Sequence, residues 1–243
     1  MKIGILGTGN VGQALGIGFT TLGHDVKMGS RDPAQEKIKD WVNKAGTKAS
    51  AGTLEEAAAF CELAVLCTVW TGVENAIQLA GPDNLAGKIV IDTINPLDFS
   101  DGIPPKLAVG HTESAGEHIQ RWLSYSRVVK AFNIVGSPHM FKPDFPGGPP
   151  DMFICGNDNQ AKATVTDLLK SFGWSVVDIG GIECARYLEP MAMVWIRHFF
   201  RINSVNPVSY THLRAHATVL DLVCRLLLEN KTGLKMREIA CAV

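Results

Sequence analysis

The sequence has no excess of charge of either sign. Its 23 lysines and arginines and 24 aspartates and glutamates give a formal net charge of -1, and it has no run of five like charges. A surface without a dominant sign does not attract the phosphates of a nucleic acid or an anionic membrane. We therefore expect a small-molecule ligand, and neither a nucleic acid nor a membrane as partner.

Cysteine pairs and long apolar runs are also missing. The six cysteines form no C-x-x-C pair and have no metal-ligand spacing with histidine, which argues against a zinc site or a disulfide framework. No apolar run approaches the roughly 18 residues of a membrane helix, and no basic and apolar leader precedes the first apolar run. These absences predict reduced thiols, no metal site and a cytoplasmic protein.

The sequence does have a regular alternation of apolar runs and helical segments. The runs "KIGILG", "LAVLCTV", "KIVIDTI" and "RVVKAFNIV" show no polar alternation, and stretches with helical spacing separate them. Helices are expected at residues 34–45, 52–61, 71–80 and 112–123. Strands of this kind, separated by helices, indicate a mostly parallel sheet covered on both faces. We predict an α/β fold of the doubly wound class.

A glycine-rich turn follows the first apolar run. Gly7, Gly9 and Gly12 form G-x-G-x-x-G between that run and a segment with helical spacing. In this motif Gly7 permits the tight turn, Gly9 lets the backbone approach a pyrophosphate, and Gly12 lets the helix pack closely on the strand. The amides at the helix N-terminus would bind the phosphates. The alternative is a tight turn with no ligand, but the strand before and the helix after favour a Rossmann-type dinucleotide-binding domain.

The end of the second predicted strand, in "HDVKMGSRD", lacks the acid that an NAD-binding unit places there. Ser30 occupies that position and Arg31 follows it. A carboxylate would repel a 2′-phosphate, whereas a hydroxyl and a guanidinium can bind one. The site therefore favours NADP(H). Two alternatives stay open: Arg31 is a surface charge, or Asp32 is a displaced ribose acid, although Asp32 before Pro33 is more typical of a helix cap.

Seven further segments resemble a known family. They are "GILGTGNVG", "MGSRDP", "IDTINPL", "GHTESAGEHIQRWL", "VVKAFN", "PDMFICGND" and "IGGIECARYLEPM", which together extend from residue 1 to about residue 200. The chain resembles the NADP-dependent coenzyme F420 reductase-like oxidoreductases, which include the reductase domain of the STEAP metalloreductases. The resemblance implies hydride transfer between NADP(H) and a flavin or F420, and it does not choose between these acceptors.

The resemblance also implies where the cofactor lies. The implied contacts are Thr8, Gly9, Asn10 and Val11 over the pyrophosphate, Ser30 and Arg31 at the 2′-phosphate, Val69, Trp70, Asn95 and Pro96 along the cofactor, and Ala131, Phe132 and Asn133 near the nicotinamide. Each has a plainer alternative: Asn95 and Pro96 as a turn pair, Trp70 as core, and Phe132 as strand packing.

Hydride transfer between two cofactors needs no protein nucleophile, because the protein aligns the rings and excludes water. The candidate catalytic residues are therefore polar groups near the reacting face, Asn133 and His139. His139 is a candidate proton or hydrogen-bond donor to the acceptor ring, or else a solvated loop histidine. His111 and Glu113 are interpreted as loop and helix-start residues, with Thr112 or Ser114 as the cap.

The predicted domain covers residues 1–203, and residues 204–243 are an atypical tail. "VSYTHLRAH" corresponds to one reading frame of a common transposase sequencing adaptor, which favours a sequence artefact. The alternative is a genuine helical extension, because "TVLDLVCRLLLENK" has helical spacing and is able to pack on a partner. A homodimer is one expected assembly.

The leading hypothesis is an NADPH-dependent oxidoreductase that acts on a flavin-type, deazaflavin-type or other small acceptor, and two other functions compete with it. One is an NADPH-binding redox sensor without turnover, since binding and catalysis use the same residues. The other is an imine reductase resembling pyrroline-5-carboxylate reductase. That class needs a long helical C-terminal dimer domain, whereas residues 125–182 indicate further strand, helix and strand.

Overall fold

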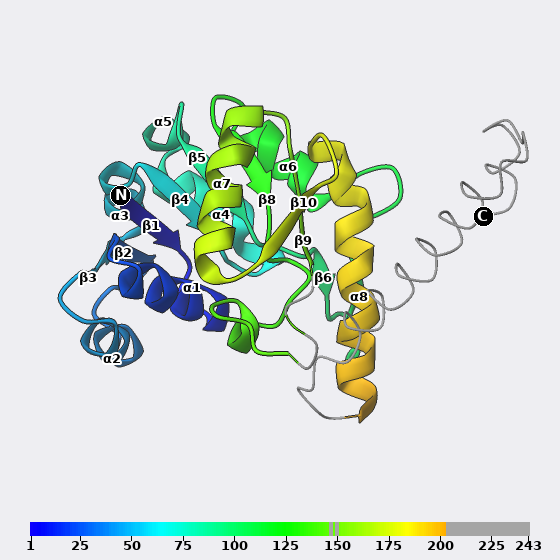
Figure 1. Ribbon diagram of the computed structural model, residues 1–243, viewed down its shortest axis with the longest axis horizontal. Helices are drawn as coiled ribbons and strands as arrows, with labels where there is room; N and C mark the ends of the chain where they lie inside the picture. The colour runs from blue at the N-terminus through cyan, green and yellow to red at the C-terminus, as the bar shows by residue number, and fades with distance from the viewer. Residues whose placement is uncertain (146–147, 149–150, 203–243) are drawn as a thin grey trace, which may run out of the picture.

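The computed structural model describes residues 1–145, 148 and 151–202. Strands and helices alternate along most of this length (Figure 1). The strands are β1 (Lys2–Leu6), β2 (Asp25–Ser30), β3 (Ala49–Thr53), β4 (Leu63–Leu66), β5 (Ile89–Asp92), β6 (Leu97–Asp98), β7 (Lys106–Leu107), β8 (Arg127–Lys130), β9 (Asp151–Gly156) and β10 (Ser175–Asp178). The helices are α1 (Asn10–Thr21), α2 (Glu36–Ala45), α3 (Leu54–Phe60), α4 (Trp70–Ala80), α5 (Pro82–Leu85), α6 (Ala115–Trp122), α7 (Asn159–Phe172) and α8 (Ala185–Ile202), with 3-10 turns η1 (Ser137–His139) and η2 (Ile182–Cys184).

Eight strands form one sheet in the order β10-β9-β8-β5-β4-β1-β2-β3. The six strands from β3 to β8 in this order are parallel. β9 and β10 are parallel to each other, but β9 runs antiparallel to β8. The predicted doubly wound α/β fold with a mostly parallel sheet is confirmed, and the reversal at β9 is a feature that the apolar runs did not indicate.

Helices cover both faces of the sheet, so its central strands are buried. On one face α1 lies beside α7, where the rings of Phe19 and Phe172 have centroids 4.7 Å apart. On the other face α3, α4 and α6 follow one another. α8 packs against α6 and η2 and stands at the edge of the molecule (Figure 1). This arrangement leaves the carboxyl ends of the parallel strands as the open edge.

Local sequence signals correctly located two helix starts. The Thr53 hydroxyl accepts from the Glu56 amide, and the Glu56 carboxylate accepts from the Thr53 amide, so the expected capping box opens α3. Ser114 caps α6 by accepting from the Glu117 amide. The predicted cap at Asp32 is wrong, because α2 starts at Glu36 and the Asp32 carboxylate instead accepts from the Ala34 amide.

Two strands of the eight-stranded sheet differ from the sequence prediction, and the short strands β6 and β7 outside it were not predicted either. β3 was not predicted, because "ASAGT" holds small residues with low strand propensity. The run "RVVKAFNIV" forms a strand only up to Lys130. Phe132 lies beyond the strand with a φ of 62°, a left-handed conformation that non-glycine residues rarely adopt. The chain therefore turns sharply at Phe132, and this turn sets the direction of Asn133.

The predicted tail, residues 204–243, lies outside the described residues, so the domain boundary near residue 203 stays a prediction. In the part of the chain that the structure does describe, none of the helices combines the length and the apolarity that crossing a membrane requires.

Candidate active site

The carboxyl ends of the central parallel strands lie in one row. Pairing aligns Leu6 with Leu66, Leu66 with Asp92, and Asp92 with Lys130. The loops that leave β1, β4, β5 and β8 therefore start side by side. In an open α/β sheet this edge is where ligands bind, at the point where the strand order reverses.

The glycine turn between β1 and α1 has the geometry of a phosphate-binding loop. Gly7 has a φ of 135°, and a Cβ there would lie 2.6 Å from the Cys67 carbonyl oxygen. A Cβ on Gly12 would lie 2.9 Å from Cys67 Sγ, which explains the close packing of α1 on the sheet. A Cβ on Gly9 would meet no atom within 4 Å, so Gly9 faces open space. The expected roles of the three glycines fit this geometry.

α1 begins directly at this turn without a side-chain cap. Gly9 is its N-cap residue, and no acidic side chain lies in the first turn. The first amides of a helix have no partner inside the helix and carry a partial positive charge. An uncapped N-terminus beside open space suits a pyrophosphate.

A cavity of about 640 Å³, the glycine-turn chamber, extends from this turn to the end of β2. Its wall includes Gly9, Ser30, Arg31 and Lys37. Among all the described residues on this wall there is no aspartate or glutamate. Asp32 is not on its wall. Two cations and no carboxylate suit a dianionic 2′-phosphate better than a ribose hydroxyl pair.

Ser30 is almost fully buried, and its hydroxyl shapes the loop that carries Arg31. Ser30 Oγ accepts from the Asp32 amide at 3.1 Å and donates to the Asp32 carbonyl oxygen at 3.0 Å. The Arg31 side chain is exposed. The loop therefore holds its backbone through Ser30 and leaves the guanidinium free to turn toward a ligand.

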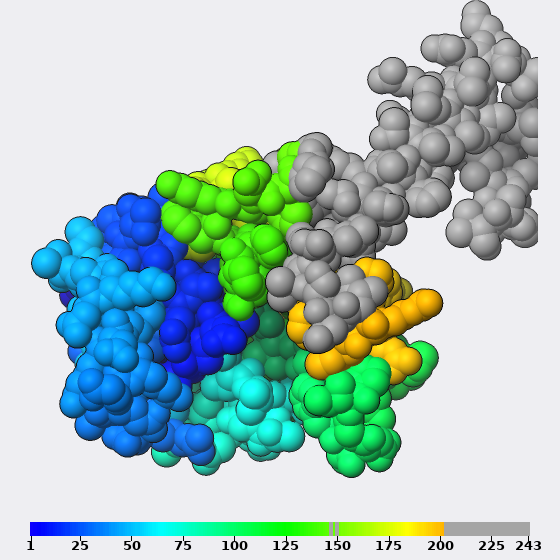
Figure 2. Space-filling view, turned by 90° about the horizontal axis from the view of Figure 1, so that it is seen from below, coloured from blue at the N-terminus to red at the C-terminus, as the bar shows by residue number. Residues whose placement is uncertain are grey.

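A second cavity of about 920 Å³, the apolar chamber, continues from the first one past α4. Asn10, Val11, Cys67, Thr68, Val69 and Thr71 line both chambers, so the two are joined. Figure 2 shows this face of the molecule hollowed between the N-terminal segment in blue, the cyan segment that contains α4, and the green segment near β6 and β7. The far wall of the apolar chamber is α8, with Trp195, Ile196 and Phe199.

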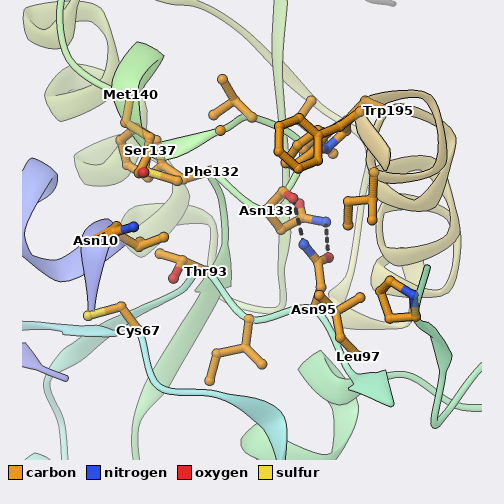
Figure 3. A pocket seen from close by; sticks show the side chains of 18 of the residues that line it. Asn10, Cys67, Thr93, Asn95, Leu97, Phe132, Asn133, Ser137, Met140 and Trp195 are labelled. Carbon is orange, nitrogen blue, oxygen red and sulfur yellow. Dashed lines mark hydrogen bonds between the residues drawn. The ribbon is translucent and has the colours of Figure 1, made fainter. Parts of the chain in front are cut away.

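Two asparagines on neighbouring loops form a fixed pair in the apolar chamber (Figure 3). Asn95 Nδ2 donates to the Asn133 carbonyl oxygen at 2.7 Å, and Asn133 Nδ2 donates to Asn95 Oδ1 at 3.0 Å and to the Leu188 carbonyl oxygen at 2.9 Å. Asn10, Cys67 and Thr93 lie on the opposite side of the chamber in this view. The pair joins the loops after β5 and β8 to α8.

A buried ion cluster lies beneath the asparagine pair. Lys130 Nζ is 2.7 Å from Asp92 Oδ2, 3.0 Å from Glu189 Oε1 and 2.7 Å from the Ile94 carbonyl oxygen. All three charged side chains are at most 1% exposed. Burial alone would lower the pKa of Lys130, but the charges of Asp92 and Glu189 outweigh this and raise it. The cluster therefore fixes the loops after β5 and β8 with a charged lysine.

Glu189 connects this cluster to the next helix. Its carboxylate also accepts from the amides of Ala115 and Gly116 at the start of α6. A Cβ on Gly116 would lie 2.9 Å from the Ala185 Cβ, so only glycine allows this close approach. The segment "ESAGE" thus docks α6 on α8. His111 and Glu113 are not on the wall of either chamber, in agreement with their interpretation as loop and helix-start residues.

His139 lies in η1 on the wall of the apolar chamber, partly buried, with its ring centroid 5.0 Å from that of Phe145. The other titratable side chains on the described wall are Cys67, Asp98, Asp151 and His198. Burial raises the pKa of the Cys67 thiol to about 12, so this thiol is not a nucleophile at neutral pH. Across residues 1–145, 148 and 151–202, no three histidine, cysteine or acidic side chains are grouped to hold a metal ion.

The buried thiols give a direct test of this packing. Burial raises the pKa of Cys155 to about 12 as well. Because the thiolate is the reactive form, we expect iodoacetamide at about pH 8 to leave Cys67 and Cys155 unlabelled in the folded protein and to label both after denaturation. Peptide mass spectrometry reads each site separately. Equal labelling of Cys67 in the folded and the denatured protein would contradict its position beneath the glycine turn.

The structure brings most of the sequence-predicted site residues to the two chambers. Those on a wall are Gly7, Thr8, Gly9, Asn10, Val11, Ser30, Arg31, Val69, Trp70, Asn95, Phe132, Asn133 and His139. Gly12, Pro96 and Ala131 are on neither wall. Gly12 packs α1 on β1, and the Pro96 carbonyl oxygen accepts from the Ala108 amide. The amide of the buried Ala131 donates to the Asp92 backbone carbonyl oxygen.

Sequence reasoning missed two kinds of wall residue. Lys37 was not proposed, although a second basic residue shortly after the Ser30 position was a readable signal. The wall residues of α8, including Trp195, carried no such signal, because an amphipathic aromatic helix is more often core than a binding surface. Trp70 has both roles at once: it lines the apolar chamber and stacks on Trp122, with centroids 5.9 Å apart.

The fold and the glycine turn at the switch point define a Rossmann-type dinucleotide-binding domain. Residues 2–96 match the family model described as NADP oxidoreductase, coenzyme F420-dependent. Over 206 residues the chain is 31% identical to the F420-dependent NADP reductase of Methanocaldococcus jannaschii, covering 81% of this chain and 91% of that protein. It is 29% identical over 196 residues to rat metalloreductase STEAP3, a match with 79% of this chain but only 36% of that protein.

Solved structures agree with these relatives. A protein of Arthrobacter sp. FB24, solved as a candidate F420-dependent NADP reductase, superposes with a TM-score of 0.81 at 40% identity, covering 85% of this chain and 96% of that one. A reductive aminase of Aspergillus terreus in complex with NADPH has a TM-score of 0.62 at 20% identity over 97% of this chain and 80% of that one, which shows the fold alone. The chain belongs to the F420-dependent NADP reductase family and is an NADP-dependent oxidoreductase.

Proposed function

We propose that this protein is an NADPH-dependent reductase that transfers hydride to a flavin-type or deazaflavin-type acceptor. The observation that carries the proposal is the pair of joined chambers at the strand ends: one is built for a phosphate-rich cofactor and the other is a large apolar space beside it. Six shared wall residues connect them, so a nicotinamide and a planar acceptor are able to meet at the junction.

The residues of the glycine-turn chamber fit NADP(H). The α1 amides and Gly9 would hold the pyrophosphate, and Arg31 with Lys37 would hold the 2′-phosphate. The bound cofactor would supply the hydride, and the protein would align the two rings and exclude water. The loops that do this are held by the Asn95–Asn133 pair and the Lys130 cluster beneath it.

The relatives support a deazaflavin or flavin acceptor without choosing one. The archaeal reductases are F420-dependent by name, and the metalloreductases are much longer proteins, of which this chain spans 36%. A cytoplasmic location and a homodimer remain part of the proposal.

The test is NADPH oxidation by the full chain with FMN, F420, a naphthoquinone and a cyclic imine as parallel acceptors. We expect oxidation that needs an acceptor, prefers NADPH to NADH, and is fastest with FMN or F420. Turnover with the imine alone would identify an imine reductase instead. Tight NADPH binding with no oxidation by any acceptor would identify a redox sensor.

A further inference from the structure

The apolar chamber holds an unusual set of polar atoms. In the described part of the chain, the buried side-chain atoms without a hydrogen-bond partner in the protein are Thr68 Oγ1, Asn133 Oδ1 and Trp195 Nε1. All three residues line this one chamber. Leaving such an atom unpaired costs about 1–3 kcal/mol, and native proteins leave few of them. Three in one cavity indicate a ligand that supplies their partners.

The orientation of the Asn133 side chain is fixed by its neighbours. Its Nδ2 donates to the Leu188 carbonyl oxygen, which is only able to accept, so the amide cannot be flipped without losing that bond. Asn133 Oδ1 is consequently an acceptor without a donor, in a residue that is 2% exposed. A ligand N–H is the group that satisfies it.

Trp195 offers the complementary group. An indole nitrogen is a donor only, so Trp195 Nε1 needs a ligand acceptor such as a carbonyl oxygen. Trp195 lies two turns after Leu188 on α8, on the side that faces the chamber, and a Cβ on Gly136 would be 4.0 Å from the Trp195 ring. The indole therefore lies over the loop that follows Asn133, as Figure 3 shows.

The hydrogen-bond donor Trp195 and the hydrogen-bond acceptor Asn133 lie away from the glycine-turn chamber. Trp195 and Asn133 line only the apolar chamber, whereas Thr68 lines both chambers. Thr68 is thus placed to contact the nicotinamide end of the cofactor, and the other two are placed to contact the molecule that accepts the hydride.

We propose that Trp195 Nε1–H donates to a ring carbonyl of the hydride acceptor while Asn133 Oδ1 accepts from the adjacent ring N–H. The chamber then selects planar acceptors with a –C(=O)–NH– edge. This inference rests on the proposed function. Flavins and 5-deazaflavins both carry such an edge, whereas quinones have carbonyl groups but no ring N–H.

The first test measures binding, which does not depend on turnover. Lumiflavin is titrated into the full chain, the Trp195→Phe variant and a control, Trp122→Phe, and flavin fluorescence gives the Kd. Trp122 allows the same substitution outside both chambers. Because one hydrogen bond to a desolvated carbonyl is lost, we expect Trp195→Phe to raise the Kd by about tenfold. Trp122→Phe should keep the wild-type Kd.

The second test probes the Asn133 side of the same edge. Methylation at N3 of lumiflavin removes the ring N–H, so 3-methyllumiflavin should bind the wild type about tenfold more weakly. If Trp195 and Asn133 bind the same edge of the flavin, methylation should weaken binding less in Trp195→Phe than in the wild type, because the effects of contacts that act together are not additive. A merely structural role for Trp195 would leave the methylation effect unchanged.

The outcomes separate this inference from the proposed function. If the wild type binds lumiflavin and both changes weaken that binding as expected, but NADPH is not oxidised, the proposed reductase function is contradicted. The proposed recognition of the –C(=O)–NH– edge by Trp195 and Asn133 then still holds. Equal lumiflavin Kd values for wild type and Trp195→Phe, or no lumiflavin binding at all, would overturn the inference. A loss of NADPH affinity in Trp195→Phe that matches its loss of lumiflavin affinity would also overturn it, since the indole would then serve the cofactor.

Discussion

Replacing Arg31 with aspartate should weaken NADPH binding by about 100-fold and change NADH binding by less than about threefold. The substitution removes a guanidinium from the glycine-turn chamber and adds a carboxylate where the wall has none. A 2′-phosphate would lose a charge-assisted hydrogen bond and meet a like charge, whereas a 2′-hydroxyl would lose little. Fluorescence titration of both cofactors with the two proteins measures the effect.

The control for this variant is Lys39→Asp. The Lys39→Asp substitution makes the same change of charge on α2, but Lys39 is exposed and lies on neither chamber wall. A general electrostatic effect would weaken NADPH binding in both variants. A local contact of Arg31 with the cofactor would weaken it in Arg31→Asp alone. Equal losses of NADPH and NADH affinity in Arg31→Asp would show that Arg31 does not bind a 2′-phosphate.

Replacing Lys130 with methionine should lower the free energy of unfolding by about 3–5 kcal/mol, because it leaves Asp92 and Glu189 buried without a cation. That is a large share of the roughly 5–15 kcal/mol that stabilises a typical domain. Urea unfolding followed by circular dichroism measures the loss. The raised pKa of Lys130 means that this stabilisation is complete below the ordinary lysine value of 10.5 and is lost only in stronger alkali.

Two variants show whether the loss comes from the uncompensated carboxylates. Lys106→Met removes an exposed lysine that pairs with Asp98 and Asp101, and the urea midpoint should stay at the wild-type value. Adding Glu189→Gln to Lys130→Met removes one buried charge, and stability should partly return. A double variant less stable than Lys130→Met would contradict an ionic role for the cluster.

The fold could be predicted because its signals are local. Apolar runs, the glycine turn and the capping pair at Thr53 each lie within a few residues of sequence, and each forms where expected, although the strand in "RVVKAFNIV" ends at Lys130. The ion cluster could not be predicted in this way, since Asp92, Lys130 and Glu189 meet only through strand register and the docking of α8. Charged residues inside the runs "KIVIDTI" and "VVKAFN" were the available signal.

The residues that line the glycine-turn chamber were largely predictable, whereas the polar candidates predicted for the apolar chamber were Asn133 and His139 and did not include Trp195. The proposed phosphate contacts lie in or next to a sequence motif, so their positions are readable from the sequence. The direction of Asn133 depends on the left-handed turn at Phe132, and the position of Trp195 depends on how α8 crosses the strand ends. Neither leaves a pattern in the sequence.

The measurement that tests the central claim most directly is a single-turnover reaction of the full chain under anaerobic conditions. The NADPH complex is mixed with FMN or F420, and the loss of the reduced nicotinamide absorbance is followed together with reduction of the acceptor. We predict that both change at the same rate, and that NADPH deuterated at the transferred position reacts more slowly. An NADPH complex that persists unchanged with both acceptors would contradict the assignment of this protein as a flavin or deazaflavin reductase.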